Sequence, residues 1–178
     1  MNDNIVYDNQ FNANEWYSIA LMVIGLAAIR FFPRSFSPLQ TTFNLLIGIT
    51  FGLVFDHTIA IPPFDLYDFG DQSKYQLFDI ISYAMYMPFG YWFIYWHERM
   101  RVGGLLTIVY IFVWAWLGVA VETAGVYVGM FHYKADYRLA YSFPIYLLLQ
   151  SIHLGLYRMA FSRTRLNRAP PKSPTGPP

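Results

Sequence analysis

The sequence predicts an all-α integral membrane protein, a bundle of about five transmembrane helices. Apolar runs long enough to cross a bilayer, for which a helix needs about 20 residues, recur along the chain. Charged residues make up only 13% of it, against about 25% in a typical soluble domain. Hydrophobic residues make up 56%. These observations favour a multi-pass membrane protein over a soluble one.

The ends of the first three helices are predicted from anchoring and helix-breaking residues. The five expected spans cover residues 16–32, 43–61, 76–96, 105–126 and 141–161. Trp16 is an interfacial anchor, and Arg30 must extend its side chain toward water at the other end of the first span. Pro62 ends the second span, because proline cannot continue helical hydrogen bonding. Pro88 should kink the third span.

The last two spans complete one transmembrane helical domain over residues 1–161. The apolar run of the fourth span continues to Phe131, which leaves its end open. Pro144 fits the first turn of the fifth span, where its missing N–H costs nothing. Residues 162–178 are rich in proline and arginine, so we expect a disordered basic tail whose cations lie near anionic lipid.

The distribution of cations predicts the orientation in the membrane. Nine of the twelve Lys and Arg residues fall on one side of the five expected spans: Arg30, Arg34, Arg99, Arg101, Arg158, Arg163, Arg165, Arg168 and Lys172. Lys74, Lys134 and Arg138 fall on the other side. Because cytoplasmic loops carry the excess of positive charge, we expect the N-terminus outside the cell membrane and the C-terminus in the cytoplasm.

Composition limits the chemistry and the partners. The chain has no cysteine, which excludes disulfides, thiolate catalysis and cysteine–metal sites. We find no cofactor motif, and the basic tail is typical of a topology and lipid signal, not of a nucleic-acid arm. The expected partner is the lipid bilayer, with other membrane proteins or a second copy of the chain as further candidates.

Three acids lie within the expected spans: Asp56, Asp79 and Glu122. The predicted topology places all three in the outer half of the membrane. Ionisable groups at that depth are costly and lead by default to a hypothesis of function. Glu122 lies in a seam of small residues spaced by three and four: Ala115, Gly118, Gly125 and Gly129. A second seam, Gly48 and Gly52, has the GxxxG spacing that permits close helix approach.

The acids allow three interpretations. In the structural one, each acid is held by tyrosine hydroxyls or backbone and locks the helix packing, within a polar network that we expect to include Asn44, Tyr83, Tyr86, Gln150 and His153. In the functional one, Glu122 and Asp79 form a central pair, with Asp56 beside them, that handles protons or binds a polar head group. Acids that share one cavity favour function, and acids that are splayed apart and individually capped favour structure.

The third interpretation is a metal site formed by His57, His132 and the acids, since these ligand types suit zinc or iron. No helix carries an HxxxH or ExxH spacing. Adjacent Asp56 and His57 point about 100° apart on a helix, so the two rarely face one centre. The sequence therefore predicts no metal ligand set.

Several strings resemble a family of small, uncharacterised multi-pass membrane proteins of spore-forming Gram-positive bacteria. They are Pro62-Pro-Phe-Asp-Leu-Tyr-Asp68, Leu77-Phe-Asp79, Pro88-Phe-Gly-Tyr91, Glu122 with Gly129 and Tyr133, and Tyr141-Ser-Phe-Pro-Ile-Tyr146. The resemblance spans about residues 16 to 160. It implies a membrane location and no particular chemistry.

Glu122, Gly129 and Tyr133 also resemble a pattern in the integral membrane cyclases and hydratases of carotenoid biosynthesis, in which a membrane acid precedes a glycine and a tyrosine. That resemblance implies an acid that protonates a polyene. The Pro-x-Glu-Glu motif of those enzymes is absent here.

The sequence therefore leads to two hypotheses of function. The first is an accessory or envelope-associated structural component of the cell membrane without enzymatic activity. The second is a small membrane enzyme or proton-coupled carrier that acts on a lipid or isoprenoid-like substrate through its intramembrane carboxylates.

Overall fold

The computed structural model describes residues 5–73, 77–134 and 136–166, and it is predominantly helical. The elements are α1 (Ala13–Phe31), α2 (Pro38–Ile59), β1 (Tyr67–Phe69), α3 (Leu77–Tyr83), the 3₁₀ turn η1 (Ala84–Tyr86), α4 (Met87–Arg99), α5 (Leu105–Tyr127), β2 (Phe131–Tyr133), the 3₁₀ turn η2 (Leu139–Tyr141) and α6 (Ser142–Leu166). Each of the five predicted helical segments is therefore helical, with ends that differ by a few residues.

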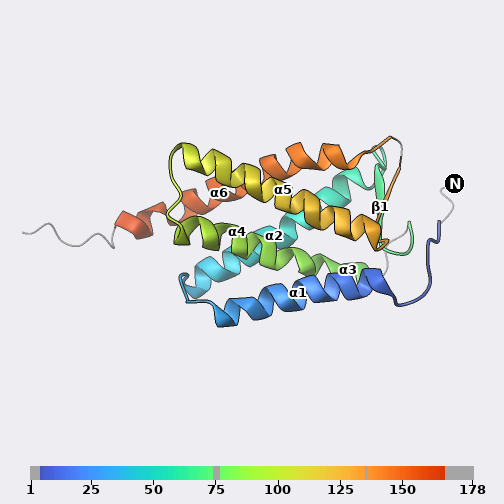
Figure 1. Ribbon diagram of the computed structural model, residues 1–178, viewed down its shortest axis with the longest axis horizontal. Helices are drawn as coiled ribbons and strands as arrows, with labels where there is room; N and C mark the ends of the chain where they lie inside the picture. The colour runs from blue at the N-terminus through green and yellow to red at the C-terminus, as the bar shows by residue number, and fades with distance from the viewer. Residues whose placement is uncertain (1–4, 74–76, 135, 167–178) are drawn as a thin grey trace, which may run out of the picture.

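The helices lie side by side and run alternately in opposite directions (Figure 1). The two strands lie at one end of the molecule, here called the ribbon end, together with the start of α1. The opposite end, here called the basic end, carries the α1–α2 and α4–α5 connections. α2 packs along α4, and α5 packs along α6, while α4 also contacts α1, α5 and α6. α4 therefore lies at the centre of the arrangement.

Side-chain caps fix the starts of the first two helices. Asn12 and Glu15 form a capping box at α1, and Ser37 and Gln40 form one at α2. Such caps satisfy backbone N–H groups that have no partner within the helix. Pro38 follows Ser37 at the first position of α2, where proline is already in helical conformation.

The third predicted span is interrupted where the sequence placed a kink. α3 passes into the 3₁₀ turn η1, and α4 begins at Met87 with Pro88 in its first turn. A proline cannot donate the hydrogen bond that would continue α3 through this point. The interruption therefore joins a short helix at the ribbon end to the longer α4.

A two-stranded antiparallel ribbon joins the connection between α2 and α3 to the connection between α5 and α6. β1 pairs with β2 in a register that places Tyr67 opposite Tyr133 and Asp68 opposite His132. The segment before α1 lies beside this ribbon, because the N–H of Tyr7 donates to the carbonyl oxygen of Asp71. The ribbon was missed in the sequence because each strand has only three residues, too few to show alternation.

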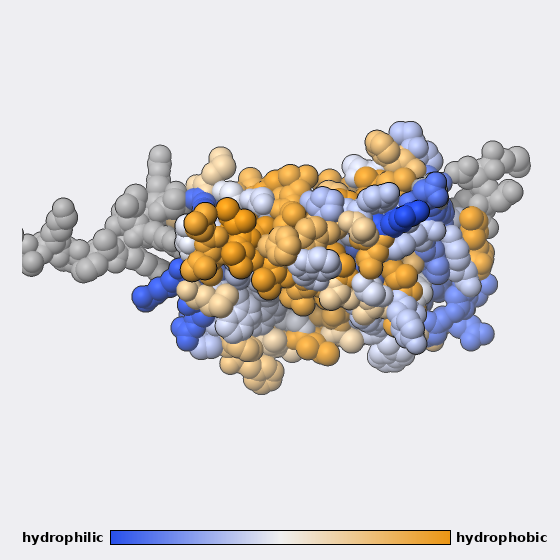
Figure 2. Space-filling model, turned by 45° about the horizontal axis from the view of Figure 1, so that its top comes forward, coloured by the Kyte–Doolittle hydropathy of each residue, from blue (hydrophilic) through white to orange (hydrophobic). Residues whose placement is uncertain are grey.

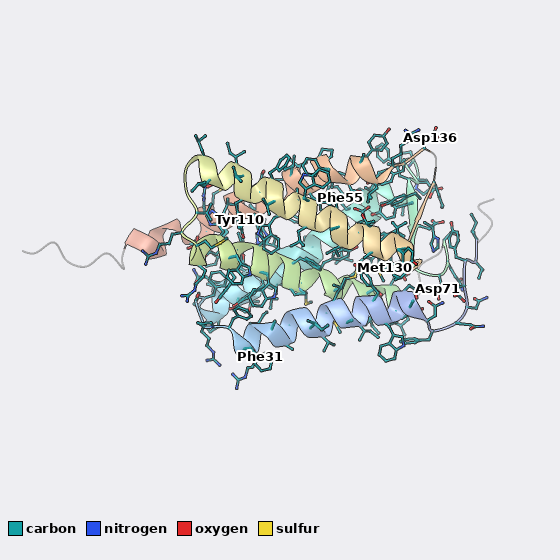
Figure 3. The ribbon with its side chains drawn as sticks, in the orientation of Figure 1. Phe31, Phe55, Asp71, Tyr110, Met130 and Asp136 are labelled. Carbon is teal, nitrogen blue, oxygen red and sulfur yellow. The ribbon has the colours of Figure 1, made fainter. Side chains whose placement is uncertain are left out.

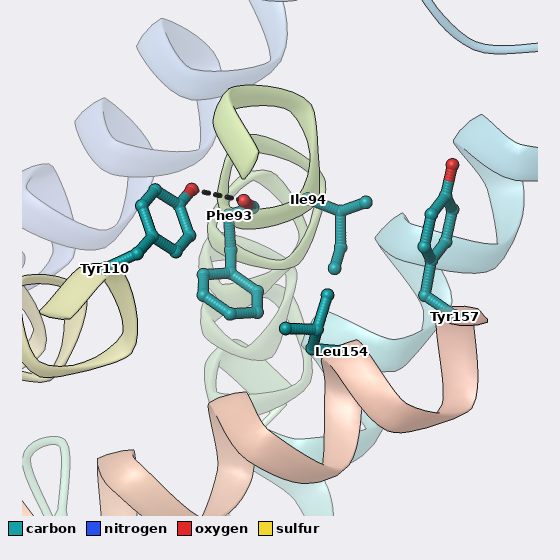
Figure 4. Close-up of a cluster of buried hydrophobic side chains, with 5 residues drawn as sticks. All are labelled: Phe93, Ile94, Tyr110, Leu154 and Tyr157. Atoms are coloured by element: carbon teal, nitrogen blue, oxygen red, sulfur yellow. Dashed lines mark hydrogen bonds between the residues drawn. The ribbon is translucent and has the colours of Figure 1, made fainter. Parts of the chain in front are cut away.

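Two apolar clusters hold the helices together. One lies toward the basic end and combines Phe93 and Ile94 of α4, Tyr110 of α5, and Leu154 and Tyr157 of α6 (Figure 4). The Tyr110 hydroxyl donates to the carbonyl oxygen of Phe93 there. The other cluster lies at the ribbon end and contains Phe69, Met85 and Met130. The first cluster therefore fixes α4 against α5 and α6, and the second packs β1 and η1 against the turn that follows α5.

Glycines allow α2 and α4 to approach closely. A Cβ on Gly48 would lie 2.4 Å from the Tyr86 carbonyl oxygen, and one on Gly90 would lie 2.3 Å from the Asn44 carbonyl oxygen. A Cβ on Gly52 would lie 2.2 Å from the Tyr86 ring. The predicted Gly48–Gly52 seam is thus a contact surface against η1 and α4.

The seam predicted around Glu122 is shorter than expected. α5 ends at Tyr127, so Gly129 does not lie on the helix. It has a φ of +82° in the turn that leads to β2, a conformation that glycine adopts without strain. Gly118 and Gly125 do face neighbouring rings, those of Tyr146 and Phe131.

Among the described residues, three helical segments are long and apolar enough to cross a membrane: α2, α5 and residues Leu139–Phe161 of η2 and α6. On the face shown in Figure 2, hydrophobic residues gather over the middle and hydrophilic residues lie toward both ends. α5 exposes many large apolar side chains, among them Leu106 and Phe112. These features are those of a membrane protein.

α6 is longer than the fifth predicted span, because it continues past Phe161 to Leu166. Residues 162–166, which were predicted to belong to a disordered tail, are therefore helical. The rest of the predicted tail lies outside the described residues.

Candidate functional site

A cavity of about 180 Å³ lies between α2, α4, α5 and α6. Its walls are mainly aromatic and aliphatic, and glycines at positions 48, 52, 90 and 118 make room for it. Phe55, which Figure 3 labels on α2, is one of the lining residues. Two acids also line it, Asp56 and Glu122. An apolar cavity with a few convergent polar groups is the usual form of a small-molecule site.

Glu122 accepts hydrogen bonds from three hydroxyl groups. Oε1 accepts from Tyr133 and from Ser142, each at 2.7 Å, and Oε2 accepts from Tyr146 at 2.8 Å. The Tyr137 hydroxyl lies 3.0 Å from Ser142 Oγ and extends the chain of hydroxyls. Hydroxyl donors therefore occupy both oxygens of this carboxyl group. Glu122 is held in place by β2 and α6 together.

Asp56 is buried, with a relative exposure of 3%. The Tyr67 hydroxyl donates to its Oδ1. Tyr83 of α3 also interacts with this carboxyl group through a hydrogen bond. Tyrosines from β1 and α3 therefore hold Asp56 in the wall of the cavity.

The tyrosines that meet the two acids stay protonated. Burial, and then the neighbouring Asp56, raise the pKa of Tyr67. Burial, and then the hydrogen bond to Glu122, raise the pKa of Tyr133. Burial likewise raises the pKa of Tyr137. All three hydroxyls are therefore donors over the physiological pH range.

Asp79 does not line this cavity. It is buried at the ribbon end beside Gly70, Ser82 and Asp71, in a separate small pocket. Figure 3 shows Asp71 and Met130, two other residues of that pocket, close together near the start of α1. Asp79 and Glu122 both act electrostatically on Asp56. The acids that share a cavity are therefore Asp56 and Glu122, in place of the predicted central pair of Glu122 and Asp79.

The predicted polar network is only partly joined. His153 Nε2 lies 2.9 Å from Asn44 Oδ1, which ties α6 to α2. Tyr83 stacks on Phe69, with ring centroids 5.7 Å apart. Tyr86 and Gln150 line the cavity, and Gln150 Oε1 makes no hydrogen bond to a described residue.

The two candidate metal-binding histidines have other contacts. His57 Nδ1 lies 2.8 Å from the Leu53 carbonyl oxygen within its own helix. His132 stacks on Tyr7, with ring centroids 3.7 Å apart. Burial lowers the pKa of His132. Among residues 5–73, 77–134 and 136–166, no group of three His, Asp or Glu side chains is placed to hold a metal ion.

An ion-pair cluster covers the ribbon end. Lys134 Nζ contacts Asp65 at 3.1 Å and Asp68 at 2.5 Å. Burial alone would lower the pKa of Lys134, but hydrogen bonds and attraction to Asp68 and Asp65 raise it. The Tyr7 hydroxyl donates to Asp68 at 2.7 Å, and burial together with that bond raises the pKa of Tyr7 to about 12. The cluster holds the segment before α1 against the ribbon.

Reasoning from the sequence expected tyrosine hydroxyls to hold the acids but did not name Tyr67, Ser142 or Tyr146 as their partners. Tyr67 lies in the string Pro62–Asp68, while Ser142 and Tyr146 lie in the string Tyr141–Tyr146. Both strings carry the resemblance to the family of spore-former membrane proteins. Their tyrosine and serine residues could have been proposed as partners of the acids on that ground.

No protein-family model, curated protein or solved structure matches this chain. The resemblances noted in the sequence therefore stay predictions.

Proposed function

We propose that this protein binds the end of an apolar, chain-like molecule in the cavity between α2, α4, α5 and α6. The observation that carries the proposal is an apolar cavity with two buried acids in its wall. An engineered apolar cavity of about 150 Å³ holds a molecule the size of benzene. A cavity of about 180 Å³ therefore suits one end of a lipid or isoprenoid-like chain, and the rest of the chain extends into the surrounding membrane.

The proposal includes a multi-pass arrangement in the cell membrane. We propose that α1, α2, the α3–η1–α4 segment, α5 and α6 each cross the bilayer, with the ribbon end outside and the basic end in the cytoplasm. The alternating helix directions support this arrangement. The cations of the basic end, such as Arg99 and Arg101 at the α4–α5 connection, support the orientation.

A structural role is the second candidate, and Glu122 favours it. Its carboxylate is fully engaged by Tyr133, Ser142 and Tyr146. A carboxyl group with both oxygens occupied by hydroxyl groups of the protein is poorly placed to contact a substrate. Glu122 therefore fits the role of a packing anchor, in a protein that serves as an accessory or envelope component.

Ligand binding can be tested through Trp114, which lines the cavity. The protein is reconstituted in phospholipid nanodiscs and titrated with dibromo-octadecane, whose bromine atoms quench tryptophan fluorescence on contact. The signal of the Trp114→Phe variant is subtracted, so that only Trp114 is followed. Binding in the cavity predicts quenching that saturates at a low mole fraction of the probe.

Two leucines on α6 provide a matched pair of variants. Leu149 lines the cavity, whereas its neighbour Leu148 is 56% exposed. Leu149→Phe should weaken binding at least tenfold by filling the cavity, and Leu148→Phe should leave it unchanged. Quenching that rises in proportion to the probe in all three proteins would contradict the proposal and leave the structural role. Native mass spectrometry of the purified protein would identify any retained apolar molecule.

A further inference from the structure

We propose that the cavity recognises a quaternary ammonium group, a cation whose nitrogen carries only carbon substituents. This inference rests on the function proposed above, because it names the chemistry at the end of the apolar chain that the cavity receives. It follows from three features of the cavity wall, which are its charge, its aromatic rings and its hydrogen bonds.

The described wall of the cavity contains two acids and no lysine or arginine. The acids are Asp56 and Glu122, and Asp79 in its separate pocket also acts electrostatically on Asp56. Lys134 at the ribbon end is engaged by Asp65 and by Asp68. Because buried charges are normally paired, a cation in the cavity would supply the partner that the wall lacks. Acidic head groups would be repelled, since like charges interact strongly where the dielectric constant is low.

Aromatic rings form much of the same wall. Ten of the lining residues are Phe, Tyr or Trp, and they come from all four helices, η1 and both strands. Tyr86 lies within the electrostatic range of both acids, and the hydroxyls of Tyr67 and Tyr146 donate to them. The faces of aromatic rings attract cations, and cages of such rings recognise quaternary ammonium groups. Rings and acids therefore lie together at one end of the cavity.

The hydrogen bonds favour a quaternary ammonium over a primary one. Both oxygens of Glu122 accept from hydroxyls of the protein, and Tyr67 and Tyr83 hold the carboxyl group of Asp56. A primary ammonium has three N–H donors, which would have to displace these hydroxyls to find acceptors. A quaternary ammonium has no donor. Its charge still attracts the carboxyl groups without direct contact, because electrostatic energy falls only with the inverse of distance.

The size of the cavity suits one trimethylammonium group. Its volume is about 180 Å³, and the group is no bulkier than benzene, which a cavity of about 150 Å³ holds. A phosphocholine head group carries a phosphate next to its ammonium, and that phosphate would lie near the same acids. We therefore expect the ammonium at the end of an otherwise uncharged apolar chain.

The first test compares two brominated octadecyl chains in the Trp114 quenching assay, one ending in trimethylammonium and the other in tert-butyl. The two end groups have the same shape and differ in charge. The protein is held in dodecyl maltoside micelles, which contribute neither charge nor ammonium groups. We expect the trimethylammonium probe to bind wild type at least tenfold more tightly. Equal binding of the two probes would overturn the inference.

Competitors then identify the form in which the group is bound. Unlabelled octadecyltrimethylammonium should displace the cationic probe, and octadecylammonium, choline and dioleoylphosphatidylcholine should each compete at least tenfold less well. Equal competition by octadecylammonium would overturn the preference for a quaternary nitrogen. Equal competition by choline would assign the site to a free cation, and equal competition by the phospholipid would assign it to a phosphocholine head group. Either result would overturn the placement on an uncharged chain.

Variants test the roles of the acids. Asp56→Asn removes the charge but keeps an oxygen that accepts from Tyr67, and Glu122→Gln removes the second charge. Each should lower the preference for trimethylammonium over tert-butyl, and the double variant should abolish it. Binding of the tert-butyl probe shows in each case that the cavity is still formed. An unchanged preference in the double variant would overturn the role of the acids.

Tyr86 tests the role of the rings. Replacing Tyr86 by trifluorophenylalanine keeps the shape of the ring but weakens the negative charge of its face, so the preference for trimethylammonium should fall. Tyr86→Phe is the matched control, because it keeps an unmodified ring, and it should retain the preference. Equal preferences in these two proteins would overturn the contact between the cation and this ring.

The outcomes separate this inference from the proposed function. Saturable binding of the tert-butyl probe to wild type, without any advantage for the trimethylammonium probe, would overturn the inference and leave the proposed cavity function intact. If neither probe binds wild type in a saturable way, the inference and the proposed function fail together.

Discussion

Tyr67 and Tyr133 lie opposite each other across the β1–β2 ribbon, and their hydroxyls donate to different acids. Tyr67 reaches Asp56 on α2, and Tyr133 reaches Glu122 on α5. Directly opposite residues on an antiparallel pair point to the same side of the sheet. One short ribbon therefore holds both acids of the cavity and couples the ribbon ends of α2 and α5, two helices that belong to different pairs.

Removing the negative charge of Glu122 should destabilise the fold. In Glu122→Gln, the amide nitrogen is a donor and cannot accept from Tyr146, so at least one hydrogen bond is lost. Hydrogen bonds to charged groups contribute about 1.5–3 kcal/mol each, and we expect a loss of about 2 kcal/mol. Thermal unfolding in detergent, followed by tryptophan fluorescence, measures it.

Asp136→Asn is the control for that measurement, because Asp136 is exposed and lies in the loop between β2 and η2. Asp136→Asn should change stability by less than about 0.5 kcal/mol. An unchanged melting temperature in Glu122→Gln would show that the three hydroxyls do not anchor the carboxylate.

Adding a methyl group to the α2 seam should push helices apart. Gly48→Ala would place Cβ 2.4 Å from a backbone oxygen of Tyr86, which cannot rotate away. Overpacking of this kind costs about 1–3 kcal/mol. The effect is measured as a lower melting temperature and a lower yield of folded protein.

Gly155→Ala in α6 is the matched control for Gly48→Ala, since a Cβ at Gly155 meets nothing within 4 Å. Gly155→Ala should stabilise the protein by about 0.5–1 kcal/mol, because alanine loses less conformational freedom in a helix. Equal destabilisation by both substitutions would refute the close approach of α2 and η1.

The protein should become less stable at alkaline pH, because Tyr7 and Lys134 at the ribbon end lose their protons. The pKa of Tyr7 is raised to about 12 in the folded chain from an ordinary value of 10.0, and that of Lys134 is also raised. Because both groups hold their protons more tightly when folded, their contribution is present below about pH 10 and is lost as the pH rises through the folded pKa values. Unfolding temperatures from pH 8 to 12 follow this loss.

The Tyr7→Phe variant measures the contribution of Tyr7 to this pH dependence. It removes the bond to Asp68 and should flatten part of the decline between about pH 10 and 12. Tyr127→Phe is its control, because Tyr127 is 92% exposed, and it should follow the wild-type curve. A Tyr7→Phe curve identical to wild type would mean that Tyr7 does not hold the N-terminal segment on the ribbon.

The absence of cysteine from the chain makes the proposed topology directly testable. Single cysteines are introduced at two exposed positions at opposite ends, Ala140→Cys beside the ribbon and Met100→Cys at the basic end. A membrane-impermeant maleimide should label the Ala140→Cys variant in intact cells and should label the Met100→Cys variant only after lysis. The reverse pattern would invert the topology, and labelling of both variants in intact cells would exclude it.

Much of the helical framework could be predicted from single residues. Pro62 and Pro88 mark real interruptions, and Gly48 with Gly52 marks a real contact surface, because both effects are local to the backbone. α6 continues to Leu166, past the predicted end of the fifth span at residue 161, and Gly129 lies beyond the end of α5 and not in its packing seam. An apolar run does not show where a helix stops, and Gly129 is compatible both with a packing seam and with a turn.

The sequence alone determined that the chain is helical and apolar enough for a membrane, and that its unusual groups are Asp56, Asp79 and Glu122. Composition and helical spacing are local properties, and they suffice for those conclusions. Only the tertiary structure decided that Asp56 and Glu122 share a cavity, that Asp79 lies outside it, and that tyrosines from the ribbon and α6 hold the acids. Those relationships join residues far apart in the chain through helix packing that no local pattern specifies. The contact between Asn44 and His153 is of the same kind.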